Sequence, residues 1–223
     1  MKKNLLIYLL LSIILLPLTG CVSFRSDVQG LYTSQSSITK KKPVKVFFDL
    51  YHYKKDSGLD VIPKLLNYPG TGDFDDIFKE SLKQLTNIGG FETFTNYARD
   101  ISDKARLQKR DSAVSRADYT VKIEIFRDKS FAKHFLGGLV STVSMTVIPI
   151  GFSWDYTTQI SVIDNENSVI AKYTRSASVS TWWQFLATPF YPFYTEEKKT
   201  EEIYLEMMSD IFRQIDSESV LKL

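Results

Sequence analysis

The sequence has a single cysteine and only two histidines among its 223 residues. With one cysteine there can be no internal disulfide, so the fold must be stabilised by its core alone. His52 and His134 lie far apart, and no cysteine or acidic residue stands at metal-ligand spacing from them. We therefore expect no metal centre.

Motifs of common enzymes are also lacking. There is no Gly-x-Ser-x-Gly motif and no Ser-x-x-Lys motif with its companions. Gly70–Asp73 superficially resembles a phosphate loop, but it lacks the closing Gly-Lys-Ser/Thr, and the nearby Asp75 and Asp76 would repel an anion. Adjacent carboxylates on a helix point apart, so these two do not form a catalytic dyad. The sequence predicts a protein that is not an enzyme.

Neither sign of charge is in large excess. The chain carries 28 basic and 26 acidic residues, and removal of residues 1–20 would take away two lysines and no acid. Nucleic-acid-binding domains usually carry a clustered basic excess, so we expect no nucleic-acid partner.

The amino-terminal end has the pattern of an export signal. Lys2 and Lys3 precede an apolar run over residues 5–16, which Pro17 ends. Such a run is too short to cross the roughly 30 Å hydrocarbon layer as a permanent helix, but it suits a signal peptide. The segment closes on Leu18-Thr19-Gly20-Cys21.

This ending resembles the lipobox of bacterial lipoproteins. The resemblance implies cleavage after Gly20, removal of residues 1–20 as a lipoprotein signal peptide, and a covalent lipid on Cys21 in place of any other cofactor. Two or three acyl chains give lasting attachment to the membrane, at ~0.8 kcal/mol per buried methylene. In these families an aspartate after the cysteine retains the protein in the inner membrane. Val22 stands there, which implies the outer membrane, with the domain facing the periplasm. The alternative is an ordinary signal peptide with a chance cysteine.

The remaining chain divides into two parts. Residues 21–42 are rich in Ser, Thr, Gln and Lys without periodicity, which predicts a lipidated flexible tether. At 5–6 Å × √n it would place the domain on the order of 25 Å from the bilayer. Residues 43–223 are long enough for a single domain with a substantial core.

Hydrophobic periodicity predicts the elements of that domain. Period-two alternation indicates strands at residues 44–50, 91–97, 119–125, 156–164 and 169–175, the last two joined by a turn at 165–168. A helix is expected from Asp73 to Ile88, stopped by Gly89-Gly90. Residues 98–117 suggest an exposed helix and loop. A last helix, capped by Thr195, buries a stripe of Tyr204, Met207, Met208, Ile211 and Ile215. The order predicts an α+β fold, a mostly antiparallel sheet with helices packed on one face.

Two long segments lack charge. Residues 134–154 and 176–195 contain no Asp, Glu, Lys or Arg. The first contains glycines, a proline and a period-two centre, which favours a strand over a membrane-spanning helix. Because the predicted hairpin turns at 165–168, its open end brings both segments to the same end of the sheet.

The second segment is unusually aromatic. Its members are Trp182, Trp183, Phe185, Phe190, Tyr191, Phe193 and Tyr194. They could cap the core, as buried aromatics usually do. They could also form an apolar surface that contacts a membrane interface or a partner protein.

Two further resemblances follow. A set of positions resembles uncharacterised bacterial envelope lipoproteins: Leu136–Leu139, Val147–Pro149, Tyr156, Asp164, Thr181-Trp182 and Pro189-Phe190. The element order is loosely similar to the Tol amino-terminal domain and the curli-channel-subunit fold, at Val44–Phe48, Ile88–Phe91, Ala117–Tyr119 and Asp164. These matches imply the fold and assign no site residue.

The sequence therefore predicts a membrane-anchored envelope lipoprotein that acts as a binding or assembly module. Its expected partners are the membrane, through the acyl chains, and an envelope protein. The alternative is a membrane-inserting component that uses residues 134–154.

Overall fold

The computed structural model describes residues 20–33, 41–55, 63–66, 74–129, 150–184 and 195–222. The strands are β1 Gly20–Arg25, β2 Val44–Lys55, β3 Lys64–Leu65, β4 Ile88–Asn96, β5 Tyr119–Lys129, β6 Ile150–Asp164 and β7 Val169–Gln184. The helices are α2 Phe74–Leu82, the 3₁₀ helix η1 Ala98–Ser102, α3 Lys104–Val114 and α5 Glu196–Ser217.

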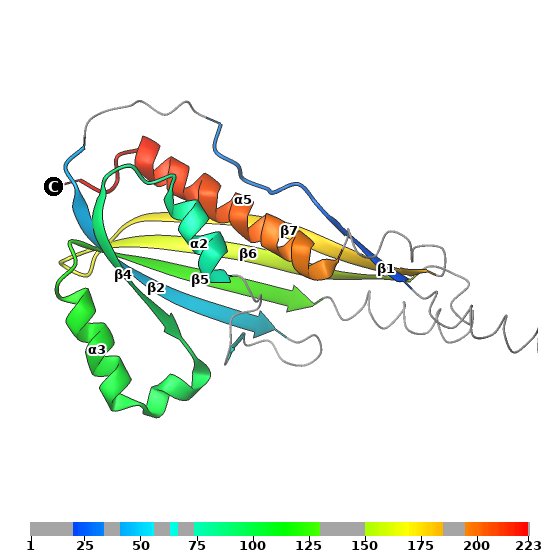
Figure 1. Ribbon diagram of the computed structural model, residues 1–223, viewed down its shortest axis with the longest axis horizontal. Helices are drawn as coiled ribbons and strands as arrows, with labels where there is room; N and C mark the ends of the chain where they lie inside the picture. The colour runs from blue at the N-terminus through cyan, green and yellow to red at the C-terminus, as the bar shows by residue number, and fades with distance from the viewer. Residues whose placement is uncertain are drawn as a thin grey trace, which may run out of the picture.

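The strands form one sheet in the order β1-β7-β6-β5-β2-β3, and β4 also pairs with β2. Strand β2 runs parallel to both β4 and β5, and the other described pairs are antiparallel. Helices α2 and α5 pack side by side over one face of this sheet (Figure 1). We call it the core face and the other the outer face. The α+β fold predicted from the sequence is confirmed.

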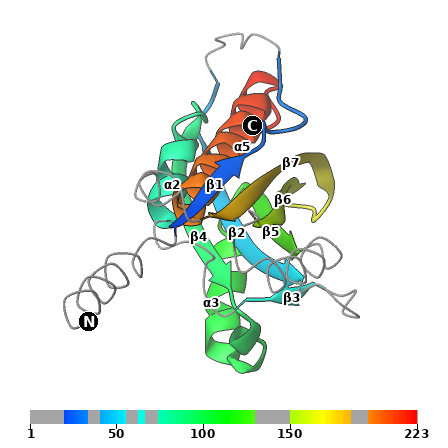
Figure 2. The same ribbon diagram turned by 90° about the vertical axis from the view of Figure 1, so that its right-hand side faces the viewer.

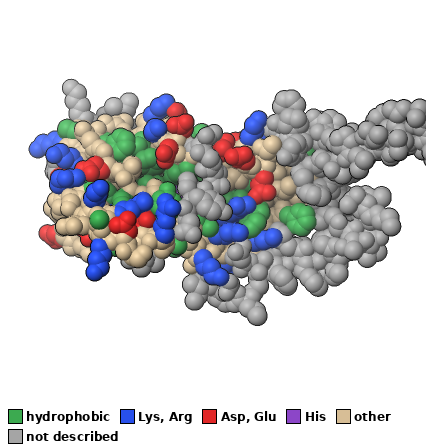
Figure 3. Space-filling view, turned by 60° about the horizontal axis from the view of Figure 1, so that its bottom comes forward, with side chains coloured by type: hydrophobic (Ala, Val, Ile, Leu, Met, Phe, Trp, Pro, Cys, Tyr) green, Lys and Arg blue, Asp and Glu red, His purple; other side chains and the backbone are tan. Residues whose placement is uncertain are grey.

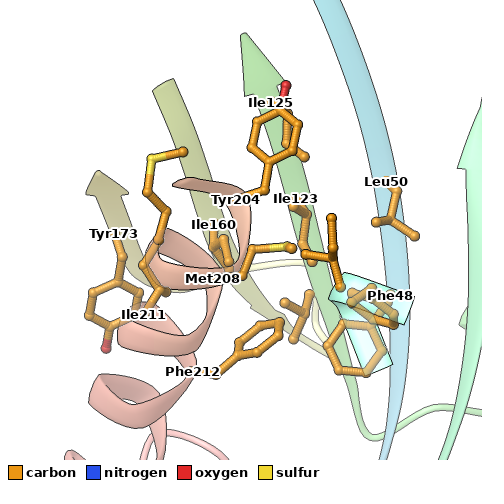
Figure 4. Close-up of a cluster of buried hydrophobic side chains, with 14 of the residues drawn as sticks. Phe48, Leu50, Ile123, Ile125, Ile160, Tyr173, Tyr204, Met208, Ile211 and Phe212 are labelled. Atoms are coloured by element: carbon orange, nitrogen blue, oxygen red, sulfur yellow. The ribbon is translucent and has the colours of Figure 1, made fainter. Parts of the chain in front are cut away.

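Period-two alternation in the strands builds the core. Phe48, Ile123 and Ile160 point to the core face and have no exposed area. They meet α5, which presents the predicted stripe, including Met208 and Ile211, against them (Figure 4). All five residues of that stripe are buried, because 3.6-residue periodicity keeps them on one side of the helix.

Local sequence explains where α5 begins. The Thr195 hydroxyl accepts a hydrogen bond from the Lys198 backbone N–H at 3.3 Å, which is the predicted cap. Glu196 and Glu197 follow in the first turn, where their charges suit the helix dipole.

The β6–β7 hairpin is longer than the sequence pattern predicts. Asp164 Oδ1 accepts hydrogen bonds from the backbone N–H groups of Glu166 and Ser168, at 3.0 and 2.8 Å. Asn167 takes a positive φ of 64°, which asparagine tolerates well. The turn therefore lies where it was predicted, while both strands continue well beyond residues 156 and 175.

Helix α3 lies on the outer side of the sheet, across from α2 and α5 (Figure 2). Its single buried residue in the described structure, Ala113, lies in a groove with Phe47 of β2. Arg106 donates to the Thr95 carbonyl at 2.7 Å and stacks on Phe94. Helices α2 and α5 therefore cover the same face of the sheet, as expected. The polar α3 contacts the sheet mainly through residues of β4 at its edge.

The first predicted helix is shorter than expected. Helix α2 ends at Leu82, and Gly89 and Gly90 belong to β4 rather than stopping the helix. A Cβ at Gly89 would lie 2.9 Å from Pro43 Cβ. The glycine therefore permits the close approach of β4 to the start of β2. In the sequence alone, a glycine needed for such an approach looks the same as one that ends a helix.

The expected flexible tether over residues 21–42 is wrong for the described part of that segment. Residues 20–25 form β1 and pair antiparallel with β7 at the edge of the sheet. Ser23 Oγ lies 2.8 Å from Thr181 Oγ1 in a buried hydrogen bond. Serine and threonine side chains form favourable hydrogen-bonded pairs across neighbouring strands. A segment whose composition is typical of linkers therefore forms an edge strand here.

The described residues between β1 and β2 contact the domain. Val28 is buried in the core, and the Tyr32 backbone N–H donates to Asp210 Oδ2 at 3.0 Å. Lys41 pairs with Asp216 at 3.1 Å. Burial acts to raise the pKa of this carboxyl, but two hydrogen bonds from Thr86 and the contact with Lys41 together lower it below its usual value. The folded domain thus begins near residue 20, not at residue 43.

Candidate functional site

Several strands end together at one end of the sheet, which we call the open end. It comprises the strand termini at residues 20, 55, 129, 150 and 184. In the register, Trp183 pairs with Cys21 on one side and with Ile150 on the other. The two uncharged segments therefore adjoin the sheet at the same end, as the hairpin topology predicts.

The predicted lipidation residue lies at this end. Cys21 and the preceding Gly20, the expected cleavage position, are the first two residues of β1. The backbone of Cys21 is fixed by pairing with β7. Cys21 is therefore part of the sheet and not of a flexible segment.

Among the predicted aromatic surface residues, the structure describes the side chain of Trp182. It is 43% exposed and lies across from Val22 and over Gly151, where an added Cβ would meet its ring at 3.1 Å. Phe24, two residues along β1, is 52% exposed. Trp182 thus belongs to an exposed apolar surface and is not part of the core.

The side chains of the remaining predicted surface residues lie outside the described residues. Trp183 contributes its backbone to β7, and its side chain lies outside the described residues. Phe185, Phe190, Tyr191, Phe193 and Tyr194 also lie outside them, as do residues 134–149. Their surface role stays a prediction.

Sequence reasoning missed a cluster of cations around Trp154, on the core face near the open end. The Arg127 guanidinium lies 4.0 Å from the centre of the Trp154 ring. The Lys54 and Lys129 ammonium groups lie 5.7 and 5.2 Å from it. We call these four residues the Trp154 cluster. The sequence does show Arg127 and Lys129 two positions apart at the end of a predicted strand. It does not show that Trp154 lies opposite them, because that depends on how β5 and β6 pair.

An acid of α5 pairs with this cluster. Glu196, at the start of α5, pairs with Arg127 at 2.6 Å. The buried Arg127 Nε has no hydrogen-bond partner within the described chain. Beneath the cluster, burial raises the pKa of Tyr156, although the nearby Arg127 opposes the shift. The cluster therefore places three cationic side chains against one aromatic ring.

A second polar group lies on the outer face. Asp49 accepts hydrogen bonds from Asn96 Nδ2 at 2.6 Å and from the Tyr51 hydroxyl at 2.9 Å. Burial raises the pKa of Asp49, while these two donors oppose the shift. These contacts join β4 to β2. We therefore assign the group a structural role.

Among the described residues, His52 and the acidic pair Asp75 and Asp76 lie in different surroundings. His52 is buried, its ring packs edge-on against Phe74 at 4.6 Å, and burial lowers its pKa to about 4. His134 lies outside the described residues. Asp75 and Asp76 are exposed in the first turn of α2. Within the described ranges, no group of three or more His, Cys, Asp or Glu residues is placed to hold a metal ion.

Another surface that sequence reasoning missed surrounds Phe91, which is 50% exposed on the edge strand β4. One groove beside it is lined by Leu82, Leu85 and Lys79. A second, on the α3 side, includes Arg116, which pairs with Glu92 at 3.0 Å. In the view of Figure 3, basic and acidic side chains are interspersed and do not form one basic area.

No protein-family model matches the chain, and no curated protein matches it. The solved structures that match include two dodecamers of PelC from Paraburkholderia phytofirmans, one of them a point variant. Each is 9% identical to this chain with a TM-score of 0.32, and the alignments cover 88% and 87% of this chain and 98% of the other. Similarity this low supports no argument, so no property of PelC is carried over.

None of the helices in the described part of the chain combines the length and the apolar character needed to span a bilayer.

Proposed function

We propose that this protein is a membrane-anchored envelope lipoprotein that acts as a non-catalytic binding and assembly module. The proposal starts from Leu18–Cys21, which resembles a lipobox. The observation that carries it is the pairing of Cys21 with Trp183 in the sheet. Acyl chains on Cys21 would hold the folded domain at the bilayer with no free chain between them.

This attachment would orient the domain. The open end would lie at the membrane, and the β6–β7 turn at residues 165–168 would point away from it. With Val22 after the cysteine, the proposed location is the outer membrane, with the domain in the periplasm. The proposed envelope partner would bind the exposed apolar surface of Phe24 and Trp182, beside the anchor.

Acylation is tested by metabolic labelling with a palmitate analogue. The native chain should incorporate the label and fractionate with the membrane, and Cys21→Ser should incorporate none. Labelling that persists in Cys21→Ser, or its absence from the native chain, contradicts the proposal.

Partner binding is tested by placing a photocrosslinking amino acid at Phe24 or Trp182. The matched control positions are Val169 and Ile170, which are 60% and 44% exposed near the hairpin turn. The proposal expects one discrete protein adduct from the open-end positions and none from the controls. Lipid adducts alone would instead favour the alternative, a membrane-inserting component that uses residues 134–154. Residues 150–154 of that segment are paired in β6.

A further inference from the structure

Strand β4 lies at one border of the sheet, beside β2 (Figure 1). The Val44 backbone N–H donates to the Asn87 carbonyl at 2.8 Å, so the even-numbered residues of β2 direct their backbone groups toward β4. In a parallel pair, such residues bond the two neighbours of their partner and not the partner itself. The partners of the next two even-numbered residues are Phe91 and Thr93. The N–H and C=O groups of these two residues therefore point away from the sheet.

The outward groups of Phe91 and Thr93 make no hydrogen bond with any residue that the structure describes. Just beyond them, Arg106 donates to the outward carbonyl of Thr95 at 2.7 Å. Strand β4 contains no lysine or proline, the residues that often keep a strand edge from pairing. Its one charged residue, Glu92, is held in an ion pair on the α3 side. The edge at Phe91 and Thr93 is thus open to one more strand.

Two grooves flank this edge, and they differ in chemistry. The groove on the core side has an apolar lining from α2, β4 and the turn between them: Leu82, Leu85, Ile88 and Phe91. Its two basic residues, Lys79 and Lys83, each pair with an acid one helical turn away. Successive side chains of an added strand point to opposite faces of a sheet. Every second side chain of that strand would therefore meet an apolar groove.

The groove on the α3 side is basic. It and the pocket that adjoins it on α3 are lined by Lys45, Lys109 and Arg116, and Glu92 is the one acid among their described lining residues. Glu92 already accepts from Arg116 through both carboxylate oxygens, each at 3.0 Å. The Lys45 and Lys109 ammonium groups make no ion pair with a described residue. The side chains that enter this groove should therefore be acidic, because a carboxylate forms charge-assisted hydrogen bonds with ammonium groups.

We propose that the β4 edge binds an extended segment of a partner protein, which adds as a strand beside Phe91 and Thr93. Its apolar side chains would face α2 and alternate with acidic side chains that face α3. Backbone hydrogen bonds would supply affinity, and the two grooves would supply specificity. Phe91 is level with Val46, nine residues before the end of β2 at Lys55. At ~3.3 Å per residue the site lies about 30 Å from the open end, so it goes beyond the proposed function and does not depend on acylation of Cys21.

The test uses the full chain in detergent micelles and two synthetic peptides as probes, one alternating Val with Glu and the other alternating Val with Lys. NMR follows the hydrogen exchange of each backbone amide. The Phe91 and Thr93 amides should exchange quickly in the free protein and at least about tenfold more slowly with the Val/Glu peptide, because pairing protects them. The Val/Lys peptide at the same concentration should protect neither. Equal protection by the two peptides, or none by the Val/Glu peptide, overturns the proposal.

Matched variants separate backbone pairing from side-chain contact. Thr93→Pro removes an outward N–H but no hydrogen bond to β2, and proline is tolerated on edge strands. It should weaken binding of the labelled Val/Glu peptide at least about tenfold in fluorescence anisotropy. Thr93→Val keeps the backbone and should bind as the native chain does. Equal affinities of these two variants contradict strand addition.

Charge variants test the groove on the α3 side and decide the assignment if Thr93→Pro does not fold. Lys45→Glu with Lys109→Glu should reverse the preference, so that the Val/Lys peptide binds more tightly than the Val/Glu peptide. The control, Lys129→Glu with Lys172→Glu, makes the same change in net charge away from β4 and should keep the native preference. The same result from both double variants contradicts the proposal.

A second copy of this chain is the competing occupant of the edge. The proposal expects the native chain and Thr93→Pro to sediment alike in the same micelles when no peptide is present. A native dimer that Thr93→Pro converts to a monomer would show that the edge pairs two copies, and the assignment to a partner protein would be wrong.

Discussion

The two faces of the same strands are built from opposite chemistry. On the core face, Ile123 and Ile160 have no exposed area and pack beneath α5. On the outer face, their neighbours Lys122 and Glu124 are half-buried and pair with each other at 2.8 Å. The core face thus supplies most of the apolar burial, while the outer face uses polar contacts to position β4 and α3.

Each face also contains exceptions. The core face holds His52 and the ion pair of Arg175 with Asp210, all at most 5% exposed. The outer face holds Phe47, which is 1% exposed, and the buried Asp49. If the two faces differ in this way, substitutions on them should change the free energy of unfolding by different amounts. They should also change its dependence on pH differently.

The largest effect is expected for Phe212→Ala. Phe212 is fully buried and contacts Phe48 and Phe78 edge-on at 6.0 and 6.3 Å. Truncation should lower the free energy of unfolding by about 3–5 kcal/mol, because the cavity cannot close completely. Urea unfolding measures it. Phe24→Ala, at the 52% exposed position, is the control and should cost less than about 1 kcal/mol. Equal losses would show that the core does not centre on α5.

Arg175→Leu should cost nearly as much. Arg175 Nε donates to Asp210 Oδ2 at 2.7 Å, and both side chains are buried. Removing Arg175 leaves the buried Asp210 carboxylate with Arg213 as its one cation among the described residues, so we expect a loss of about 2–3 kcal/mol in chemical denaturation. Adding Asp210→Leu should restore part of that stability, because the incompletely paired buried charge is then gone. A double variant less stable than the single one would refute this explanation.

This comparison also shows what the sequence could and could not predict. The stripe of α5 and the alternation of β2 and β5 are local periodicities, so they were predictable. The roles of Gly89 and Ser23 were not, because each depends on a neighbour distant in sequence, Pro43 and Thr181. The Trp154 cluster was missed for the same reason, since its cations come from two strands that face a third.

His52 should make the core face sensitive to acid. Burial lowers its pKa to about 4, below the ordinary value near 6.5. The unfolded chain therefore takes up the proton first. The contribution of the neutral His52 to the free energy of unfolding is therefore fully present above pH 6.5. It is lost as the pH falls toward 4 and amounts to about 3 kcal/mol. His52→Leu should remove this loss, as measured by urea unfolding across that range. Parallel pH profiles of the two proteins would contradict the assignment.

Asp49 on the outer face should act with the opposite sign and a smaller magnitude. Burial raises its pKa above the ordinary value, so the folded protein takes up this proton first, and stability is gained as the pH falls through the raised pKa. Asp49→Asn removes that gain, so the variant should lose more stability than the native protein between pH 7 and 4.5, by about 1 kcal/mol or less. Asp111→Asn, at a carboxylate 69% exposed on α3, is the matched control and should follow the native profile. If Asp49→Asn instead loses less stability on acidification, the carboxylate is stabilised by its donors Asn96 and Tyr51 more than it is penalised by burial. The ionised form of Asp49 would then stabilise the outer face, whereas at His52 on the core face it is the neutral form that stabilises the fold.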